Sequence, residues 1–172
     1  MTEIAENKSR MFSAENTGDV IEYYKDMVYR IAFTYCKNAS DADDITQEVF
    51  LRYLKSKKEF DGEEHLKAWL IRITINLSKN FLRSAWFRKT VSISDHEHEN
   101  LCAEEQAQPK IYNAVLSLPE KYRSVVLLYY YEDYNVGETA KILRRSETSV
   151  QTQLQRARTM LKLKLKEEWQ DE

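Results

Sequence analysis

Residues 136–158 read VGETAKILRRSETSVQTQLQRAR, and this stretch decides the fold of the C-terminal half. Apolar residues recur at helical spacing in Val136–Leu143, two arginines follow, and a longer periodic segment begins near Glu147. Ser146 stands directly before that segment, where its hydroxyl can accept a hydrogen bond from a free N–H of the first helical turn. We therefore predict a short helix, a tight turn and a long helix.

Packing between these two helices leaves one face of the long helix free. Val150 and Leu154 are four residues apart and would face inward, with Val150 beneath the small Ala140. Such a layout is typical of the helix-turn-helix that docks in the major groove of DNA, although an ordinary surface helix is the alternative. In the groove, Gln can pair with adenine, and Arg can reach guanine or phosphate. The outward residues are Gln151, Thr152, Gln155, Arg156 and Arg158.

The rest of the chain also favours helices. Only three Gly and two Pro occur in 172 residues, and sheet folds need more turn residues than this. The aromatic share of 12% is enough for packed cores. We predict an all-α protein of two small helical domains joined by a flexible acidic linker. The predicted helices are Asp19–Cys36, Ser40–Lys55 with Ser40 and Asp43 as a capping box, Glu64–Ala85, Lys110–Ser117 with Pro109 before it, Glu120–Glu132, Val136–Leu143 and Glu147–Glu168.

Helical periodicity also predicts which residues of the N-terminal half are buried. The first helix would bury Val20, Tyr23, Tyr24, Met27, Val28, Ile31 and Tyr35. The second would bury Ile45, Val49 and Leu54. The third would bury Leu66, Trp69, Leu70, Ile73, Leu77 and Phe81, with Ile75 outside this stripe and free to meet a neighbouring element.

The net charge of −2 hides strongly charged blocks. Residues 52–90 hold 10 bases and 4 acids, and residues 141–166 hold 8 bases and 1 acid. Between them, residues 91–108 hold 5 acids and no base. Two basic blocks separated by an acidic one indicate two surfaces that face anions, although solvated helices also carry local charge excess.

One face of the second predicted helix is acidic. Its residues stand at i, i+3, i+4 and i+7, which places them on one side with an apolar edge: Asp44, Gln47, Glu48 and Leu51. This face would suit a basic protein surface, because complementary charge sets register and encounter rate. The alternative is a solvated acidic face. A metal site is disfavoured because no further ligands converge here.

The third predicted helix carries a basic row with amides at the same spacing: Asn76, Lys79, Asn80 and Arg83. Arg88 and Lys89 extend the charge, while Phe60 and Trp86 offer aromatic faces. Charge for phosphate, rings for stacking and amides for base edges are what a surface for single-stranded nucleic acid uses. Packing of Trp86 and Phe87 against the first helix is the alternative.

Four stretches in this order resemble the extracytoplasmic-function (ECF) type of RNA polymerase sigma factor, over about residues 18–166. They are Asp41-Ala42-Asp43-Asp44-Ile45-Thr46-Gln47-Glu48-Val49-Phe50, Ala68-Trp69-Leu70-Ile71-Arg72-Ile73 with Asn76, Leu118-Pro119-Glu120-Lys121-Tyr122-Arg123, and Arg156-Ala157-Arg158. The resemblance implies a polar tail (1–17), a region 2 domain (18–90), a linker (91–108) and a region 4 helix-turn-helix domain (109–168).

The resemblance also assigns roles and partners. It implies that Asp44, Gln47, Glu48 and Leu51 meet the β′ clamp helices of core RNA polymerase, whose β flap is a second contact. Phe60, Asn76, Lys79, Asn80 and Arg83 would handle the unwound minus-ten element of promoter DNA. The minus-thirty-five element would be bound by Ser149, Gln151, Thr152, Gln155 and Arg156, with Arg156 on phosphate. An anti-sigma protein, often at the membrane, would hold the factor inactive.

The turn of the helix-turn-helix departs from the family. Gly and an aliphatic residue usually stand where this chain has Arg144 and Arg145, so Arg144 is expected to adopt a positive φ at a cost of about 1 kcal/mol. Gln151 and Gln153 stand where the recognition helix often has basic residues. We predict fewer phosphate contacts and an altered minus-thirty-five preference.

Other signals predict function by binding alone. No nucleophile with a base, Gly-rich phosphate loop or metal spacing occurs, so we expect no enzyme activity, no cofactor, no metal and no small-molecule substrate. The absence of a long apolar run or secretory signal predicts a cytoplasmic protein, in which Cys36 and Cys102 are free thiols.

Two other functions remain open at this point. A stand-alone helix-turn-helix regulator with a ligand-sensing N-terminal half would bind duplex DNA tightly without polymerase. A purely protein-binding helical module would tolerate replacement of Asn76, Asn80 and Arg156.

Overall fold

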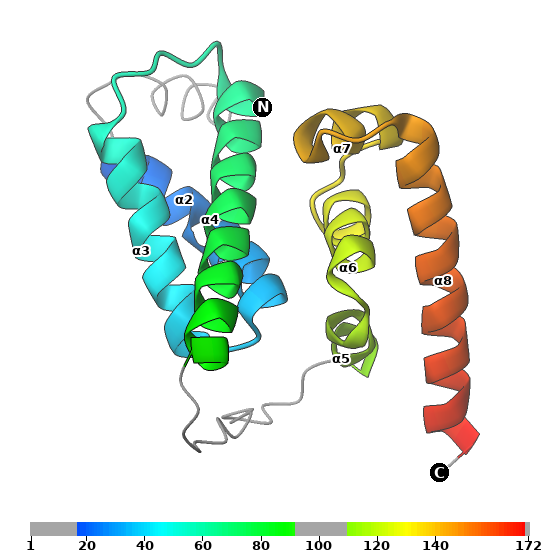
Figure 1. The fold of residues 1–172 in the computed structure, drawn as a ribbon. Coiled ribbons are helices and arrows are strands. Elements are labelled where there is room, and N and C mark those ends of the chain that lie inside the picture. The colour runs from blue at the N-terminus through cyan, green and yellow to red at the C-terminus, as the bar shows by residue number, and fades with distance from the viewer. Residues whose placement is uncertain (1–16, 92–109, 171–172) are drawn as a thin grey trace. The chain divides into compact units, whose positions relative to one another are not determined.

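The computed structural model describes residues 17–91 and 110–170, with side chains for 17–85 and 111–166. In these ranges every regular element is a helix, which confirms the all-α prediction (Figure 1). The chain divides into two compact units, Met1–Glu97 and His98–Glu172, and each is described separately. None of the helices in the described ranges is long and apolar enough to cross a lipid bilayer.

The described part of the N-terminal unit consists of three helices. They are α2 (Thr17–Cys36), α3 (Ala39–Lys55) and α4 (Glu63–Val91), and each packs against the other two. Figure 1 shows α3 beside α4. Fully buried aliphatic side chains from all three helices fill the centre: Val28, Ile31, Ala32, Val49, Leu70 and Ile71. Burial of these apolar surfaces is the main source of stability of a bundle this small.

The start of α3 corrects the predicted capping box. Asn38, in extended backbone conformation, is the N-cap, and its side chain accepts a hydrogen bond from the Asp41 N–H at 3.0 Å. Ser40 already lies inside the helix. The connection between α2 and α3 consists of only Lys37 and Asn38, which is shorter than predicted. The chain can turn within these two residues because Lys37 adopts the left-handed conformation (φ 54°).

Two aromatic or aliphatic residues expected inside lie at the surface. Tyr23 is 54% exposed and Leu54 is 53% exposed, while Phe50 takes the inner position on α3 instead. The other predicted inner residues of α2, and Ile45 and Val49 of α3, are buried as expected. A helix between two neighbours buries an arc that linear spacing locates only approximately.

The buried face of α4 is rotated from the predicted stripe. Leu66 and Leu70 are buried as predicted, but Trp69, Ile73, Leu77 and Phe81 are only half-buried. The buried set is completed by residues that the stripe omitted: Ile71, Thr74, Ile75 and Ser78. Thr74 can be buried because its hydroxyl donates to the Leu70 carbonyl at 2.7 Å.

The C-terminal unit is built along its last helix. Its elements are α5 (Lys110–Ser117), α6 (Glu120–Val126), the π-helix η1 (Leu127–Tyr131), α7 (Val136–Leu143) and α8 (Glu147–Gln170). Figure 1 shows α8 running alongside α5, α6 and α7, with which it makes contact. The predicted bounds of α5 and α7 are confirmed, whereas Pro109 and residues 92–108 lie outside the described residues.

Two apolar clusters hold α8 in place. The first joins Val115, Leu118, Tyr122, Val126 and Ala157, and the second joins Val125, Ala140, Val150 and Leu154. The predicted contact of Val150 with Ala140 belongs to the second cluster and is confirmed. Asn135 and Glu138 form a reciprocal capping box at the start of α7, which the sequence analysis missed.

The helix predicted over Glu120–Glu132 is wrong in its second half. The α-helix ends at Val126 and continues as a π-helix, in which the Glu132 N–H donates to the Leu127 carbonyl at 3.2 Å. This widened turn includes three consecutive tyrosines, of which Tyr130 is 50% exposed. Single π-turns inside helices occur frequently at functional sites.

We predict that Asn38→Ala lowers the free energy of opening of α3 by about 1 kcal/mol, because a helix N-terminal N–H loses its acceptor. Ser40→Ala is the matched control and should leave α3 nearly unchanged. Hydrogen exchange of the Val49 amide in the full chain measures both. A larger effect of Ser40→Ala would contradict the assignment of the cap.

Candidate functional site

The acidic face of α3 lies at the surface. Asp44 and Gln47 are exposed, Leu51 is 46% exposed, and Glu48 is half-buried. Their arrangement follows from the opposite face, where Ala42, Ile45 and Val49 enter the core. The exposed Leu54 enlarges the apolar edge of this face, and the sequence analysis had placed it inside.

An intrahelical ion pair modifies this face. Arg52 Nε lies 2.7 Å from Glu48 Oε1, and both side chains are about half exposed. The i, i+4 spacing of a Glu before an Arg favours such a pair on a helix surface. The carboxylate of Glu48 is therefore partly neutralised by Arg52. The carboxylate of Asp44 takes part in none of the ion pairs among the described residues. The spacing of Glu48 and Arg52 in the sequence could have revealed this pair.

The amide and basic row of α4 also faces outward. Asn76, Asn80 and Arg83 are exposed, and Lys79 is half-buried. They lie opposite the buried Ile71, Thr74, Ile75 and Ser78, so the rotation of the helix does not bury the row. The side chains of Trp86, Arg88 and Lys89 lie outside the described residues.

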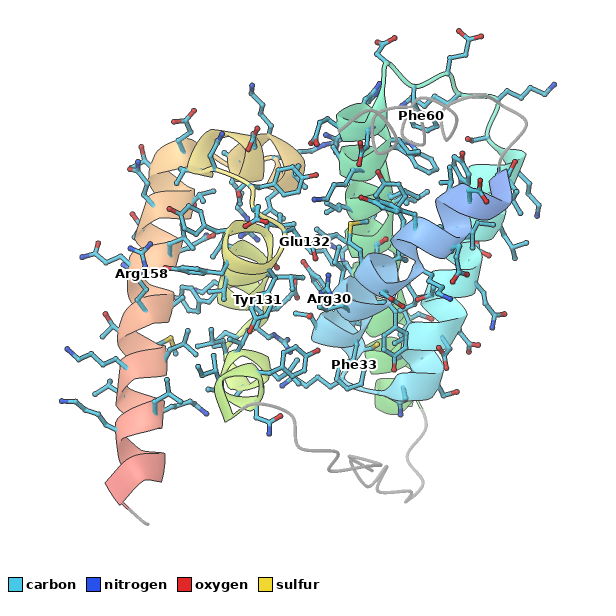
Figure 2. The ribbon with its side chains drawn as sticks, turned by 180° about the vertical axis from the view of Figure 1, so that it is seen from behind. Arg30, Phe33, Phe60, Tyr131, Glu132 and Arg158 are labelled. Atoms are coloured by element: carbon cyan, nitrogen blue, oxygen red, sulfur yellow. The ribbon has the colours of Figure 1, made fainter. Side chains whose placement is uncertain are left out.

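Phe60 is held in an aromatic cluster at the loop between α3 and α4. Its ring centroid lies 5.3 Å from that of Trp69, 5.5 Å from that of His65 and 6.2 Å from that of Tyr53. Figure 2 shows Phe60 in this loop. Its half-exposed ring is thus fixed on one side and open on the other. Edge-to-face pairs of this kind add stability beyond area burial.

His65 is a further part of this loop that the sequence analysis missed. The Asp61 N–H donates to His65 Nδ1 at 3.1 Å, and the edge of the ring meets Phe60. The His65 side chain therefore holds both the loop backbone at Asp61 and the ring of Phe60 near the start of α4. Its position four residues after Asp61, at the start of a helix, was the only signal in the sequence.

The predicted DNA-facing residues of α8 lie at the surface. Gln151, Thr152, Gln155 and Arg156 are exposed, and Ser149 is half-buried. They are fixed because Val150, Leu154 and Ala157 on the opposite side are at most 3% exposed. The sequence analysis also expected Ser146 to cap this helix, and its hydroxyl accepts from the Ser149 N–H at 3.2 Å.

The turn before α8 adopts the predicted strained conformation. Arg144 has φ 54° and ψ 50°, in the left-handed region, and its N–H points to the Lys141 carbonyl at 3.4 Å. The Arg145 N–H donates to the Ala140 carbonyl at 2.9 Å. These bonds give the turn the form of a helix C-cap, a place that glycine usually occupies.

Arg145 connects three parts of the C-terminal unit. Its Nη1 donates to Gln153 Oε1 at 2.7 Å and to the Lys121 carbonyl at 3.2 Å. Gln153 in turn donates from Nε2 to Ser149 Oγ at 3.2 Å. Gln153 is therefore held beside the turn, and the first turn of α6 is joined to α8. No residue pattern in the sequence predicts contacts at this separation.

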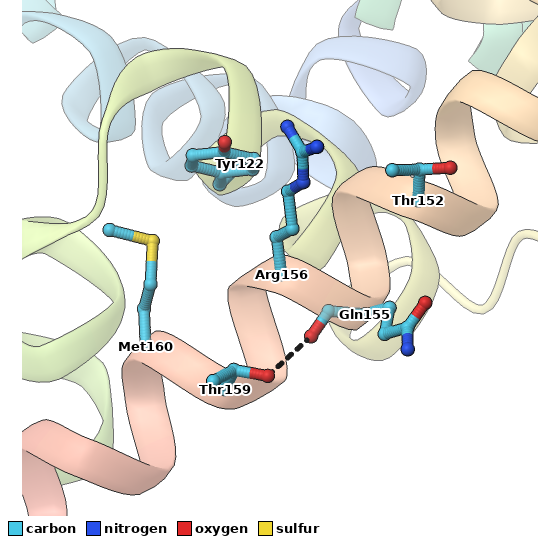
Figure 3. Close-up of a pocket in the computed structure, with 6 residues that line it drawn as sticks. All are labelled: Tyr122, Thr152, Gln155, Arg156, Thr159 and Met160. Carbon is cyan, nitrogen blue, oxygen red and sulfur yellow. Dashed lines mark hydrogen bonds between the residues drawn. The ribbon is translucent and has the colours of Figure 1, made fainter.

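Two hollows open between α6 and α8. One, of about 480 Å³, is lined by Tyr122, Thr152, Gln155, Arg156, Thr159 and Met160 (Figure 3). The other, of about 250 Å³, is lined by Lys121, Tyr122, Ser146, Thr148, Ser149, Thr152, Gln153 and Arg156. Among the described residues, those lining the hollows are cations, hydroxyls, amides and apolar groups, and none is a carboxylate.

Tyr122 is the centre of this region. Figure 3 shows Arg156 extending from α8 toward the phenol ring. Lys121 Nζ lies 4.9 Å from the ring centroid. The neighbouring Arg156 lowers the pKa of the Tyr122 hydroxyl below its usual value, and Lys121 acts in the same direction, whereas burial acts against both. Positive charge is thus concentrated beside the first two turns of α8.

Arg158 is exposed, as predicted, but it has a partner within the unit. Its Nε donates to the Tyr130 hydroxyl at 2.6 Å, which joins α8 to the π-helix. Figure 2 shows Arg158 on α8. The π-helix thus places the Tyr130 hydroxyl within hydrogen-bonding distance of α8.

Both halves of the chain match a known family. Sigma-70 region 2 matches residues 20–88, and sigma-70 region 4 matches residues 109–161. Among curated relatives, RNA polymerase sigma factor SigV of Bacillus subtilis (strain 168) is 29% identical over 149 residues, which cover 84% of this chain and 88% of SigV. ECF RNA polymerase sigma factor SigW of the same strain is 27% identical over 165 residues, which cover 87% of this chain and 88% of SigW.

Solved structures share the fold. The sigma factor RpoE, in a co-crystal structure with the anti-sigma factor NepR from Bartonella quintana, matches with a TM-score of 0.70 and 17% identity, covering 89% of this chain and 98% of that chain. CnrH, in complex with the cytosolic domain of CnrY, matches with a TM-score of 0.65 and 20% identity, covering 92% of this chain and 94% of that chain.

The chain belongs to the sigma-70 family and is a sigma factor of the ECF type. Sigma factors are transcription initiation factors and not enzymes. The family resemblance drawn from the four sequence stretches is therefore confirmed.

We predict that Arg144→Gly raises the free energy of opening of the C-terminal unit by roughly 0.5–1 kcal/mol, because relief of left-handed strain outweighs the entropy that glycine adds to the unfolded chain. Hydrogen exchange of the Leu154 amide in the full chain measures this opening. Arg144→Ala is the control, since it removes the same charge and keeps the strain. Equal effects of the two variants would mean that the charge, and not the conformation, matters.

Proposed function

We propose that each of the three exposed helix faces serves one step of promoter recognition. The α3 face (Asp44, Gln47, Glu48 and Leu51) binds the β′ clamp helices of core polymerase. The α4 row (Asn76, Lys79, Asn80 and Arg83), with Phe60, captures the unwound minus-ten strand. The α8 face (Ser149, Gln151, Thr152, Gln155 and Arg156) reads the minus-thirty-five duplex. The observation that supports this proposal is the exposure of all three faces opposite well-packed cores.

The domain division follows from the same proposal. Residues 18–90 act as the region 2 domain and residues 109–168 as the region 4 domain, with residues 91–108 as the linker between them. Separate units suit a factor whose binding sites on one polymerase lie far apart. The β flap of the polymerase is the second contact.

Control by an anti-sigma protein is part of the proposal. RpoE and CnrH share this fold, and RpoE was solved in complex with the anti-sigma factor NepR and CnrH in complex with the cytosolic domain of CnrY. The chain would act in the cytoplasm and be held there by a partner, in some conditions at the membrane. The exposed apolar edge of α3 at Leu51 and Leu54 is a surface that such a partner could cover.

Charge reversal at Asp44 tests the polymerase contact. Asp44→Lys should abolish or reduce at least about tenfold the association with core polymerase, because attraction at a complementary charged interface becomes repulsion. Asp43→Lys is the matched control, because it makes the same change of charge on the same helix. Asp43 lies near Tyr29 of α2, where burial and then the charge of Asp43 raise the pKa of the Tyr29 hydroxyl. Pull-down with core polymerase and run-off transcription from candidate promoters measure the outcome.

If Asp43→Lys and Asp44→Lys lower association equally, the α3 face has no specific role. If neither variant nor the wild-type chain supports run-off transcription, the chain would act instead as a stand-alone regulator or a sequestering module. Tight duplex binding without polymerase would favour the first of these.

The α4 row acts on melted DNA and not on the duplex. Asn80→Ala should therefore slow formation of the open complex while leaving binding to a promoter duplex nearly unchanged, because base capture stabilises only the unwound state. Fluorescence of 2-aminopurine in the minus-ten element measures opening. The control is a heteroduplex that is already unwound there, on which the variant should recover most of its rate. Equal defects on both templates would contradict a role in capturing flipped bases.

A further inference from the structure

The hollow between the first turn of α6 and the first turns of α8 has the composition of an anion site. Lys121 approaches it from α6, and Arg156 approaches it from α8. Hydroxyl and amide groups from both elements complete the lining, and no carboxylate is among the described residues that form it. Two cations that line one small hollow together attract an anion more strongly than either does alone.

The side chains around this hollow are fixed and not loosely placed. Tyr122 is 8% exposed and lies next to both cations, with Lys121 Nζ 4.9 Å from its ring centroid and Arg156 beside its hydroxyl in Figure 3. Arg145 holds the Lys121 carbonyl at 3.2 Å and Gln153 at 2.7 Å, so the α6 turn cannot move away from α8. A site that is held in shape before binding loses little entropy when its ligand arrives.

The positive charge of this hollow could replace phosphate contacts that α8 itself lacks. Gln151 and Gln153 stand at positions where basic residues would supply contacts to the DNA backbone, and Gln153 is occupied by Arg145. A helix that enters the major groove brings its N-terminal turns and the elements beside them close to the phosphates of the duplex. The hollow lies beside those turns, since Ser146 and Ser149 line it as well.

We propose that Lys121 and Arg156 together bind one backbone phosphate of the minus-thirty-five duplex in this hollow, and that the Tyr122 hydroxyl positions Arg156 for it. The proposal rests on the proposed function, in which α8 reads that duplex. It adds Lys121 and Tyr122, from outside the helix-turn-helix, to the DNA-binding residues. The lowered pKa of the Tyr122 hydroxyl agrees with the concentration of positive charge at this point.

The test uses polymerase holoenzyme reconstituted with the full chain and a labelled duplex promoter enriched from a random library by the wild-type holoenzyme. Single phosphates across the minus-thirty-five element are replaced in turn by uncharged methylphosphonate. For the wild-type chain, one replacement should weaken binding about five- to tenfold, as expected for loss of one phosphate contact near 0.1 M salt. Lys121→Ala and Arg156→Ala should each weaken binding to the unmodified duplex and lower the salt slope by about one or less.

Coupling between protein and DNA changes decides the outcome. In Lys121→Ala and in Arg156→Ala, neutralising that same phosphate should weaken binding by a smaller factor than in the wild-type chain, because one of its two cationic contacts is already lost. Tyr122→Phe keeps the ring and removes the hydroxyl. Neutralising that phosphate should therefore weaken binding less in this variant than in the wild-type chain, while the protection of the Leu154 amide from hydrogen exchange stays the same. Lys25→Ala, an exposed lysine of α2 paired with Glu22 at 2.6 Å, is the control and should behave as wild type.

The proposal is overturned if Lys121 and Arg156 couple to different phosphates, or if Lys121→Ala weakens binding to the unmodified duplex and to every singly neutralised duplex by the same factor. It is also overturned if the penalty for neutralising that phosphate is the same in Tyr122→Phe as in the wild-type chain. In those cases wild-type holoenzyme still binds its promoter more tightly than core polymerase alone, and the proposed function stands. A wild-type chain that adds no promoter binding to core polymerase would overturn the proposed function together with this one.

Discussion

Burial of one side of α8 is the constraint on which the DNA-facing surface depends. Val150, Leu154 and Ala157 enter two apolar clusters with α5, α6 and α7, and they are at most 3% exposed. Because a helix turns 100° per residue, fixing these three positions fixes the direction of every other side chain on α8. The exposure of Gln151, Gln155 and Arg156 is therefore a consequence of core packing. The same reasoning holds for α3, whose outer acidic face lies opposite Ile45 and Val49.

Periodicity predicted much of this because it records burial directly. The helix bounds Lys110–Ser117 and Val136–Leu143, the Ser146 cap and the positive φ of Arg144 all follow from local rules of spacing, capping and turn geometry. The exposed faces of α3 and α8 could be predicted for the same reason. Local rules fail where two choices are equally good, as with Asn38 and Ser40, both of which are strong N-cap residues.

The features that could not be predicted are set by contacts between distant residues. Arg145 reaches Lys121, 24 positions away, and Arg158 reaches Tyr130, 28 positions away. The π-helix at Leu127–Tyr131 depends on how the unit packs, since its residues suit an α-helix equally well. The rotation of α4 has a similar origin, because α2 and α3 both press on it and small polar side chains such as Thr74 permit close approach. The row stays exposed despite this error, because Asn76 and Asn80 lie on the side of α4 away from the buried Thr74.

The distribution of positive charge has a consequence for how the factor works. Gln at positions 151 and 153 of the recognition helix lowers the general attraction of α8 for DNA, because non-specific affinity grows with the number of phosphates neutralised. Of the remaining cations near α8, Arg158 is hydrogen-bonded to Tyr130 and Arg145 to Gln153, and Arg156 lies beside Tyr122 in Figure 3. Fixed cations favour one register of the duplex over others, whereas mobile ones would bind any register. Weak general attraction combined with a fixed register suits a factor that meets DNA as a subunit of polymerase, where the assembly supplies the affinity and this chain supplies the choice of sequence.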